Sequence, residues 1–162
     1  MQSRILGIDP GSRNMGWAVL ELETGKLLGW GTIKTKPKTP QPETLGILLQ
    51  ALEDLIAQWC PHHLALEDLF FSRNVRSAMR VGEARGMVLL ACHQHGLEPY
   101  SYTPQQLKIA AAGKGNASKE EIAEGLEGKF TRTPPTQHAG DAAAAAMCLR
   151  NEMLADNSKA AD

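Results

Sequence analysis

The sequence lacks the features that would place a protein in a membrane or on a secretory route. No apolar run approaches the ~18 residues that span a bilayer. Met1 to Arg4 is not the basic start of a signal peptide, because no long apolar stretch follows it. We therefore expect a cytoplasmic protein without a membrane partner.

The chain also has few cysteines and a small net charge. The chain has three cysteines, Cys60, Cys92 and Cys148, and this odd, widely spaced set fits neither a disulfide framework nor paired zinc ligands. We expect all three to be reduced core residues. The formal net charge is only −1, so a surface that binds nucleic-acid phosphates must be a local one.

The composition is otherwise that of an ordinary globular protein. The chain has 162 residues, of which 43% are hydrophobic and 22% charged, and this size suits one hydrophobic core. We expect a single domain over residues 1–152 and a flexible tail at residues 153–162.

The pattern of apolar residues and turn signals predicts an α/β fold. Strands are expected at residues 5–9, 15–22, 26–34, 63–67 and 98–102, and helices at 43–59, 74–95, 105–112, 118–129 and 138–151. Three strands in succession predict an antiparallel meander, and the later alternation with helices predicts parallel strands. The expected architecture is a mixed five-stranded sheet flanked by helices.

Two of these strands end on an acidic residue. Asp9 follows the apolar residues Ile5 to Ile8, and Glu67 closes the run Leu64 to Leu66. A buried carboxylate is costly unless it is paired or binds a metal, although an Asp before Pro-Gly also serves as a turn cap. Successive strand residues face opposite sides, so only one of Glu67 and Asp68 can join Asp9, and we favour Glu67.

A third acid lies at the start of the last helix. His138 and Asp141 are three residues apart and share a helical face, while Ala142 to Ala146 allow close packing on a sheet. Asp141 could instead serve only as a helix N-terminal charge. Three carboxylates suit two hard cations, Mg²⁺ or Mn²⁺, and hence metal-assisted phosphodiester hydrolysis.

These segments resemble the RuvC family of Holliday-junction resolvases, which have the RNase H-like nuclease fold. The resemblance runs from Ile5 to about Arg150 and rests on five ordered motifs: residues 7–13, 66–67, 82–86, 113–119 and 138–141. It implies that Asp9, Glu67 and Asp141 are catalytic metal ligands for two Mg²⁺ or Mn²⁺ ions. His138 matches a position that is acidic in some members, so it either ligates metal or positions water.

The resemblance also implies the biological role. The protein would be a crossover junction endodeoxyribonuclease of DNA recombination and repair, a homodimer that makes paired symmetric nicks in a four-way junction, with a branch-migration motor as a further partner. Gly82 and Gly86 lie one turn apart on a predicted helix and could allow close helix approach at the dimer interface, or pack on the sheet of their own chain.

Several residues are candidates for contact with DNA. Phe70 and Phe71 are adjacent aromatics that could stack on unpaired bases, and the resemblance favours Phe70. Basic side chains could neutralise phosphates or remain solvated surface residues. The basic candidates are Arg73, Arg76, Lys108, Lys114 and Lys119.

Two other functions fit parts of the pattern. Asp9-Pro10-Gly11-Ser12 also resembles the first phosphate loop of actin-like and sugar-kinase ATPases, but this chain has no second Gly-rich phosphate loop. A non-catalytic DNA-binding module would use the acids only as turn caps. Cleavage of a junction that depends on metal would separate the nuclease from both alternatives.

Overall fold

A mixed five-stranded sheet forms the centre of the structure, a computed structural model that describes residues 2–68, 74–127 and 136–160. The strand order is β3-β2-β1-β4-β5. The strands are β1 (Arg4–Pro10), β2 (Asn14–Glu21), β3 (Leu27–Lys34), β4 (His63–Glu67) and β5 (Pro99–Tyr102). β1, β2 and β3 form an antiparallel meander, and β4 pairs in parallel with both β1 and β5. The predicted mixed sheet is therefore confirmed.

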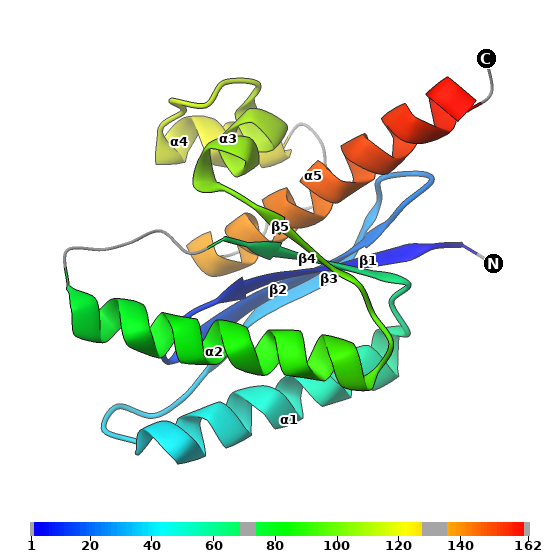
Figure 1. Ribbon diagram of the computed structural model, residues 1–162. Helices are drawn as coiled ribbons and strands as arrows, with labels where there is room; N and C mark the ends of the chain where they lie inside the picture. Colours follow the sequence, from blue (N-terminus) through cyan, green and yellow to red (C-terminus); the bar gives the residue numbers. More distant parts are fainter. Residues whose placement is uncertain (1, 69–73, 128–135, 161–162) are drawn as a thin grey trace.

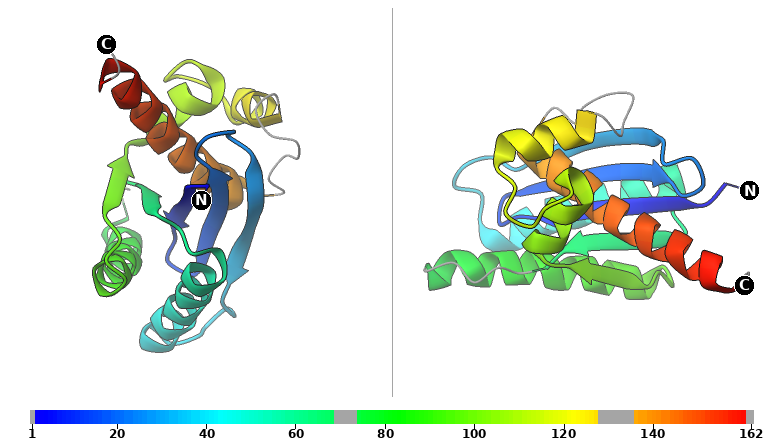
Figure 2. Two further views of the ribbon diagram at one scale, coloured as in Figure 1. Left: turned by 90° about the vertical axis from the view of Figure 1, so that its right-hand side faces the viewer. Right: turned by 90° about the horizontal axis from the view of Figure 1, so that it is seen from above.

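Helices cover both faces of this sheet (Figures 1 and 2). α1 (Gln41–Trp59) and α2 (Val75–Gln94) lie on one face, while α5 (Gln137–Ala160) crosses the other with α3 (Pro104–Ala112) and α4 (Lys119–Glu127) beside it. Among the described residues, no helix is both long enough and apolar enough to cross a bilayer.

Local signals explain where the helices begin. Asn74 caps α2 by accepting the Ser77 N–H, and Thr103 forms a reciprocal capping box with Gln106 at the start of α3. Ser118 and Glu121 exchange the same pair of side-chain to backbone hydrogen bonds at α4. These interactions fix the helix that carries Lys119.

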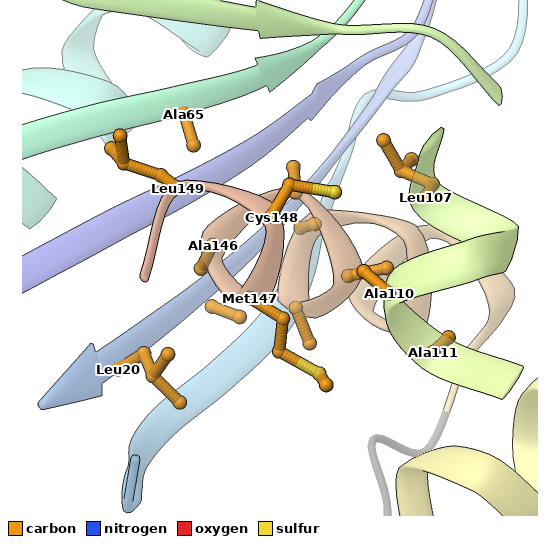
Figure 3. Packing of buried hydrophobic residues seen from close by; sticks show 14 of the residues in the cluster. Leu20, Ala65, Leu107, Ala110, Ala111, Ala146, Met147, Cys148 and Leu149 are labelled. Atoms are coloured by element: carbon orange, nitrogen blue, oxygen red, sulfur yellow. The ribbon is translucent and has the colours of Figure 1, made fainter. Parts of the chain in front are cut away.

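Side chains that alternate between the two faces of the central strands divide the core into two layers. Leu6, Ile8, Leu64 and Leu66 pack against α1 and α2. Ile5 and Ala65 face the other way, into the layer that contains the alanine-rich part of α5. Figure 3 shows Ala146, Met147, Cys148 and Leu149 of α5 between the sheet and Leu107, Ala110 and Ala111 of α3. Odd-numbered residues of β1 and β4 therefore point toward α5.

Two expectations from the sequence need correction. Cys60 is exposed, because it ends α1 with a left-handed backbone (φ 44°), whereas Cys92 and Cys148 are buried as expected. The last helix does not end near Asn151 but continues to Ala160 through most of the segment expected to be a flexible tail. That segment contains neither Gly nor Pro to stop it, and the Tyr102 hydroxyl donates a 2.6 Å hydrogen bond to Glu152.

Candidate active site

Strand register places the first two acids together. β1 and β4 are parallel, with Gly7 beside Ala65 and Ile8 beside Leu66. One further step along both strands puts Asp9 beside Glu67, on the face that α5 covers. Asp68 points elsewhere and forms an ion pair with Arg85 at 3.4 Å. The alternation of strand side chains thus selects Glu67 rather than its neighbour.

Two glycines let the third acid approach. A Cβ built at Gly7 would lie 1.9 Å from the carbonyl oxygen of Ala142, and one at Gly16 would lie 2.1 Å from that of His138. Gly16 is the β2 residue that pairs with Asp9. The backbone of α5 therefore lies directly on the sheet, where any larger strand residue would push it away from Asp9.

The result is a compact cluster of carboxylates. One oxygen each of Asp9, Glu67 and Asp141 lies within 4.8 Å of the others. His138 lies beside this cluster, with its Nδ1 2.7 Å from Oδ2 of Asp9. Residues from two strands and a helix, far apart in the sequence, therefore meet at one end of the sheet.

Burial and mutual repulsion raise the pKa of two of the acids in the cluster. Burial, followed by the charges of Asp9 and Asp141, raises the pKa of Glu67 to about 8. Burial and Asp9 likewise raise the pKa of Asp141 to about 7, although His138 and Lys119 oppose that rise. The hydrogen bond with Asp9 raises the pKa of His138 above its ordinary value, against the effect of partial burial. Crowded beside Asp9 without a cation, Glu67 and Asp141 thus hold protons that they would lose in water.

The donor set fits a hard divalent cation. Carboxylate oxygens are the ligands that Mg²⁺ and Mn²⁺ prefer. A bound cation would offset the repulsion that raises the pKa of Glu67 and Asp141. Asp9, Glu67 and Asp141 can each contribute oxygen ligands. The ring nitrogen of His138 that is not bonded to Asp9, Nε2, is the atom through which this residue would reach a metal or a water.

A cavity of about 400 Å³ opens beside the cluster among the described residues. Glu67 and Asp141 line it together with the basic Lys108 and Lys119. Lys114 does not line this cavity and instead forms an ion pair with Glu121 at 2.5 Å. Two of the three predicted lysines are therefore placed where a phosphate next to the carboxylates could reach them.

Other predicted DNA contacts lie further away or outside the described residues. Arg76 is exposed in the first turns of α2. Phe70, Phe71 and Arg73 fall in residues 69–73, which lie outside the described part of the chain.

Three supporting residues were missed in the sequence. Arg85 donates to the carbonyl oxygen of Glu67 at 3.1 Å and to the Ser101 hydroxyl at 2.8 Å, so it braces the end of β4. The hydroxyls of Thr32 and Thr136 share a 2.7 Å hydrogen bond, and Thr136 also accepts the Ala139 N–H at the start of α5. Arg85 lies in the motif at residues 82–86, but its role is not visible there, and no local pattern marks Thr32 or Thr136, because their partners are distant in the sequence.

Comparison with known proteins adds an independent line of argument. A family model described as "Crossover junction endodeoxyribonuclease RuvC" matches residues 5–149. The chain is 42% identical over 148 residues to the enzyme of that name from Desulfitobacterium hafniense, covering 89% of this chain and 90% of the relative. It is 38% identical over 149 residues to that of Finegoldia magna, covering 90% and 91%.

Solved structures agree with the sequence relatives. A Thermus thermophilus RuvC in complex with a Holliday junction substrate matches with a TM-score of 0.86 and 32% identity, over 94% of this chain and 96% of that one. A yeast mitochondrial Holliday junction resolvase has a TM-score of 0.67 at 16% identity, over 95% and 81%, and supports the fold alone. The match to RuvC identifies the sheet as RNase H-like.

Proposed function

Because the chain belongs to the crossover junction endodeoxyribonuclease RuvC family, we propose that it resolves four-way DNA junctions by hydrolysing phosphodiester bonds at the cluster of Asp9, Glu67 and Asp141. The observation that carries this proposal is the convergence of the three carboxylates within 4.8 Å beside a cavity with two lysines. The proposed place of action is the cytoplasm.

The proposed cofactor is a pair of Mg²⁺ or Mn²⁺ ions held by the three carboxylates, with His138 as a further candidate ligand. Such ions polarise the scissile phosphodiester and make water a stronger nucleophile at neutral pH. Lys108 and Lys119 would bind the phosphodiester oxygens and help to hold the scissile group against the cluster. Arg85 would keep Glu67 in place through its hold on the Glu67 carbonyl.

A homodimer is the proposed working state, since paired nicks on a two-fold substrate need two related sites. α2 offers a surface for this contact. Val75, Met79 and Leu90 expose 70%, 63% and 54% of their surface, and a Cβ at Gly86 would meet no described residue within 4 Å. These residues recur at intervals of one or two turns along one side of α2. Because exposed apolar side chains favour contact with a partner, we propose that two copies of α2 pack together. A branch-migration motor stays a predicted partner.

The decisive test of this function compares a synthetic four-way junction with a linear duplex of the same sequence, each with Mg²⁺, with Mn²⁺ and with EDTA. The wild-type protein should nick the junction at paired positions only when a metal is present. Binding without cleavage in either metal would identify a non-catalytic DNA-binding module.

Two neighbouring acids provide a matched pair of variants. Glu67→Gln should lower the nicking rate more than about 100-fold, since even outer-shell partners of a bound metal contribute 10–100-fold. Asp68→Asn makes the same exchange of carboxyl for amide one residue away and should change the rate less than about threefold. Both variants should bind the junction in EDTA as the wild type does. Equal rates for the two variants would remove Glu67 from the site.

A further inference from the structure

The connection between β3 and α1 carries a group of positive charges that the proposed site does not use. Lys34, Lys36 and Lys38 are all exposed, and no acidic residue occurs between Glu23 and Glu43. In a chain with a net charge of −1, this is a marked local excess of positive charge. We refer to residues 34–38 as the lysine loop.

The sheet places the lysine loop at the same end as the carboxylate cluster. Lys34 pairs with Asn14 at the start of β2, and that strand returns from the end of β1, where Asp9 pairs with Gly16. β3 and β1 are separated by β2, so about 10 Å separates their axes at a strand spacing of ~4.8 Å.

Hydrogen bonds fasten the loop to the turn between β1 and β2. The Arg13 guanidinium donates to the carbonyl oxygens of Lys36 and Thr39, at 3.3 and 3.4 Å. The Thr35 N–H and hydroxyl both donate to the carbonyl oxygen of Arg13, at 3.0 and 2.9 Å. The lysine backbone positions are therefore held in place before any ligand binds, which lowers the entropic cost of binding.

The cluster lies between two basic flanks. Lys108 of α3 and Lys119 of α4 line the cavity on one side of the carboxylates. The lysine loop leads from β3 to α1, which covers the opposite face of the sheet from α3 and α4 (Figure 1). DNA in a duplex advances about 3.4 Å per nucleotide along one strand. A separation of about 10 Å between β1 and β3, laid along the helix axis, therefore spans about three nucleotides.

We propose that Lys34, Lys36 and Lys38 form a second phosphate-binding flank that holds the cleaved strand on the side of the scissile phosphate opposite to Lys108 and Lys119. The inference rests on the proposed nuclease function. Its ligand is the phosphodiester backbone of junction DNA, which lysine binds without reading base sequence. The flank would fix the register of the strand across the carboxylates rather than choose the cleavage sequence.

The salt dependence of junction binding tests this role directly. Each phosphate neutralised contributes about 0.9 to the slope of log K against log salt. Lys34→Gln should therefore reduce the slope by up to about 0.9, and the triple Lys34→Gln, Lys36→Gln, Lys38→Gln variant by about 2–3, measured in EDTA. The matched control is Lys26→Gln, an exposed lysine just before the other end of β3, which should leave the slope unchanged.

A second measurement uses the unmodified protein and so does not depend on how the variants fold. Single phosphates of the junction strand are replaced by neutral methylphosphonates for about three nucleotides on each side of the nick. We expect each replacement, on either side of the nick, to weaken binding to the wild-type protein. On the side held by the lysine loop, the replacements should no longer weaken binding to the triple variant. Replacing the three lysines by arginine should preserve both the slope and the phosphate effects.

The outcomes separate this inference from the proposed function. Suppose that the wild-type protein nicks the junction and the triple variant has the same slope and phosphate effects as the wild type. That result would overturn the second flank but not the proposed nuclease function. A loss of slope in Lys26→Gln equal to that in Lys34→Gln overturns the second flank as well. A wild-type protein that nicks no junction with either metal removes the proposed function itself.

Discussion

At the scale of the residue, Asp9 is the centre of the site, because it contacts both a candidate metal cluster and the imidazole of His138. Its carboxylate is grouped with those of Glu67 and Asp141, and its Oδ2 also bonds to His138. His138 can therefore act as a ligand through Nε2 or only as a partner that orients Asp9. The two roles predict different effects of a carboxylate at position 138 on the metal preference and the pH dependence of nicking.

His138→Asp distinguishes them. Imidazole suits Mn²⁺ better than Mg²⁺ and must be unprotonated to bind either. Since Asp9 raises the pKa of His138 above its ordinary ~6.5, wild-type nicking should fall as pH drops toward that region. The Asp variant should gain rate with Mg²⁺ relative to Mn²⁺ and lose less rate at low pH. Initial nicking rates with each metal, from about pH 5.5 to 8.5, measure both effects. Unchanged metal preference and pH profile would show that His138 is not a ligand.

The raised pKa values also predict how metal-free stability depends on pH. The pKa of Glu67 is raised to about 8 in the folded protein from an ordinary 4.5, so the folded state binds this proton more tightly than the unfolded state. The resulting stability is fully present below about pH 4.5 and is lost as pH rises through about 8. Asp141, with a folded pKa of about 7, acts in the same direction.

Thermal melts in EDTA should therefore show a lower Tm at pH 8 than at pH 5.5, by roughly 2–8 °C for a loss of about 1–2 kcal/mol. Mg²⁺ or Mn²⁺ should restore the Tm more at pH 8 than at pH 5.5, because the cation binds deprotonated carboxylates. Glu67→Gln should flatten the pH dependence. A Tm that rises with pH in EDTA for the wild type would contradict these shifts.

At the scale of the element, the position of α5 on the sheet decides whether the site exists. Gly7 and Gly16 leave the space that the backbone of α5 occupies, and the hydrogen bond between Thr32 and Thr136 holds its first turn to β3. His138 and Asp141 both lie on this part of α5. A shift of the helix by 1 Å would therefore move both residues away from Asp9 together.

Gly16→Ala should show this coupling. The added Cβ would lie 2.1 Å from the His138 carbonyl oxygen, so α5 must shift, at a cost of about 1–3 kcal/mol. Nicking should fall about 100-fold, since a 1 Å misplacement of reacting groups can cost that much. The control is Gly46→Ala in α1, where a Cβ meets nothing within 4 Å and helix propensity should add about 0.5–1 kcal/mol. Urea unfolding and nicking rates measure the two effects, and full activity in Gly16→Ala would show that the helix tolerates the shift.

At the scale of the whole molecule, the proposed dimer brings two such sites onto one junction. The described chain leaves Val75, Met79 and Leu90 exposed on α2, a large apolar area for a solitary monomer. Because a Cβ at Gly86 would meet no atom of the described residues within 4 Å, packing within that part of the chain does not explain a glycine there.

Gly86→Leu should weaken dimerisation more than folding. The added side chain has room in the monomer but would separate two closely packed copies of α2, so the dimer dissociation constant should rise about tenfold or more. Gly46→Leu makes the same exchange at an open position of α1 and should leave the constant unchanged. Sedimentation over a range of concentrations, with thermal melts alongside, measures both. A strictly monomeric wild type that still makes paired nicks would exclude the dimer.

The sequence by itself determined the elements and the identity of the acids. The strand that ends at Glu67 was predicted at its observed bounds, and the ends of α1, α2 and α3 were predicted to within two residues. These features follow from alternation, helix caps and proline, which act between near neighbours in the chain. Alternation allows only one of Glu67 and Asp68 to join Asp9, and the apolar run that leads up to Glu67 favours that residue.

Only the tertiary structure decided how distant residues meet. The hydrogen bond between Asp9 and His138 joins residues 129 positions apart. Arg85 of α2 donates a hydrogen bond to the carbonyl oxygen of Glu67 in β4. Lys34 comes beside the site because β2 and β3 return to the same end of the sheet as Asp9. Strand register and the close approach of α5 at Gly7 and Gly16 bring these residues together. These contacts arise from packing between whole elements, which a local pattern of residues does not predict.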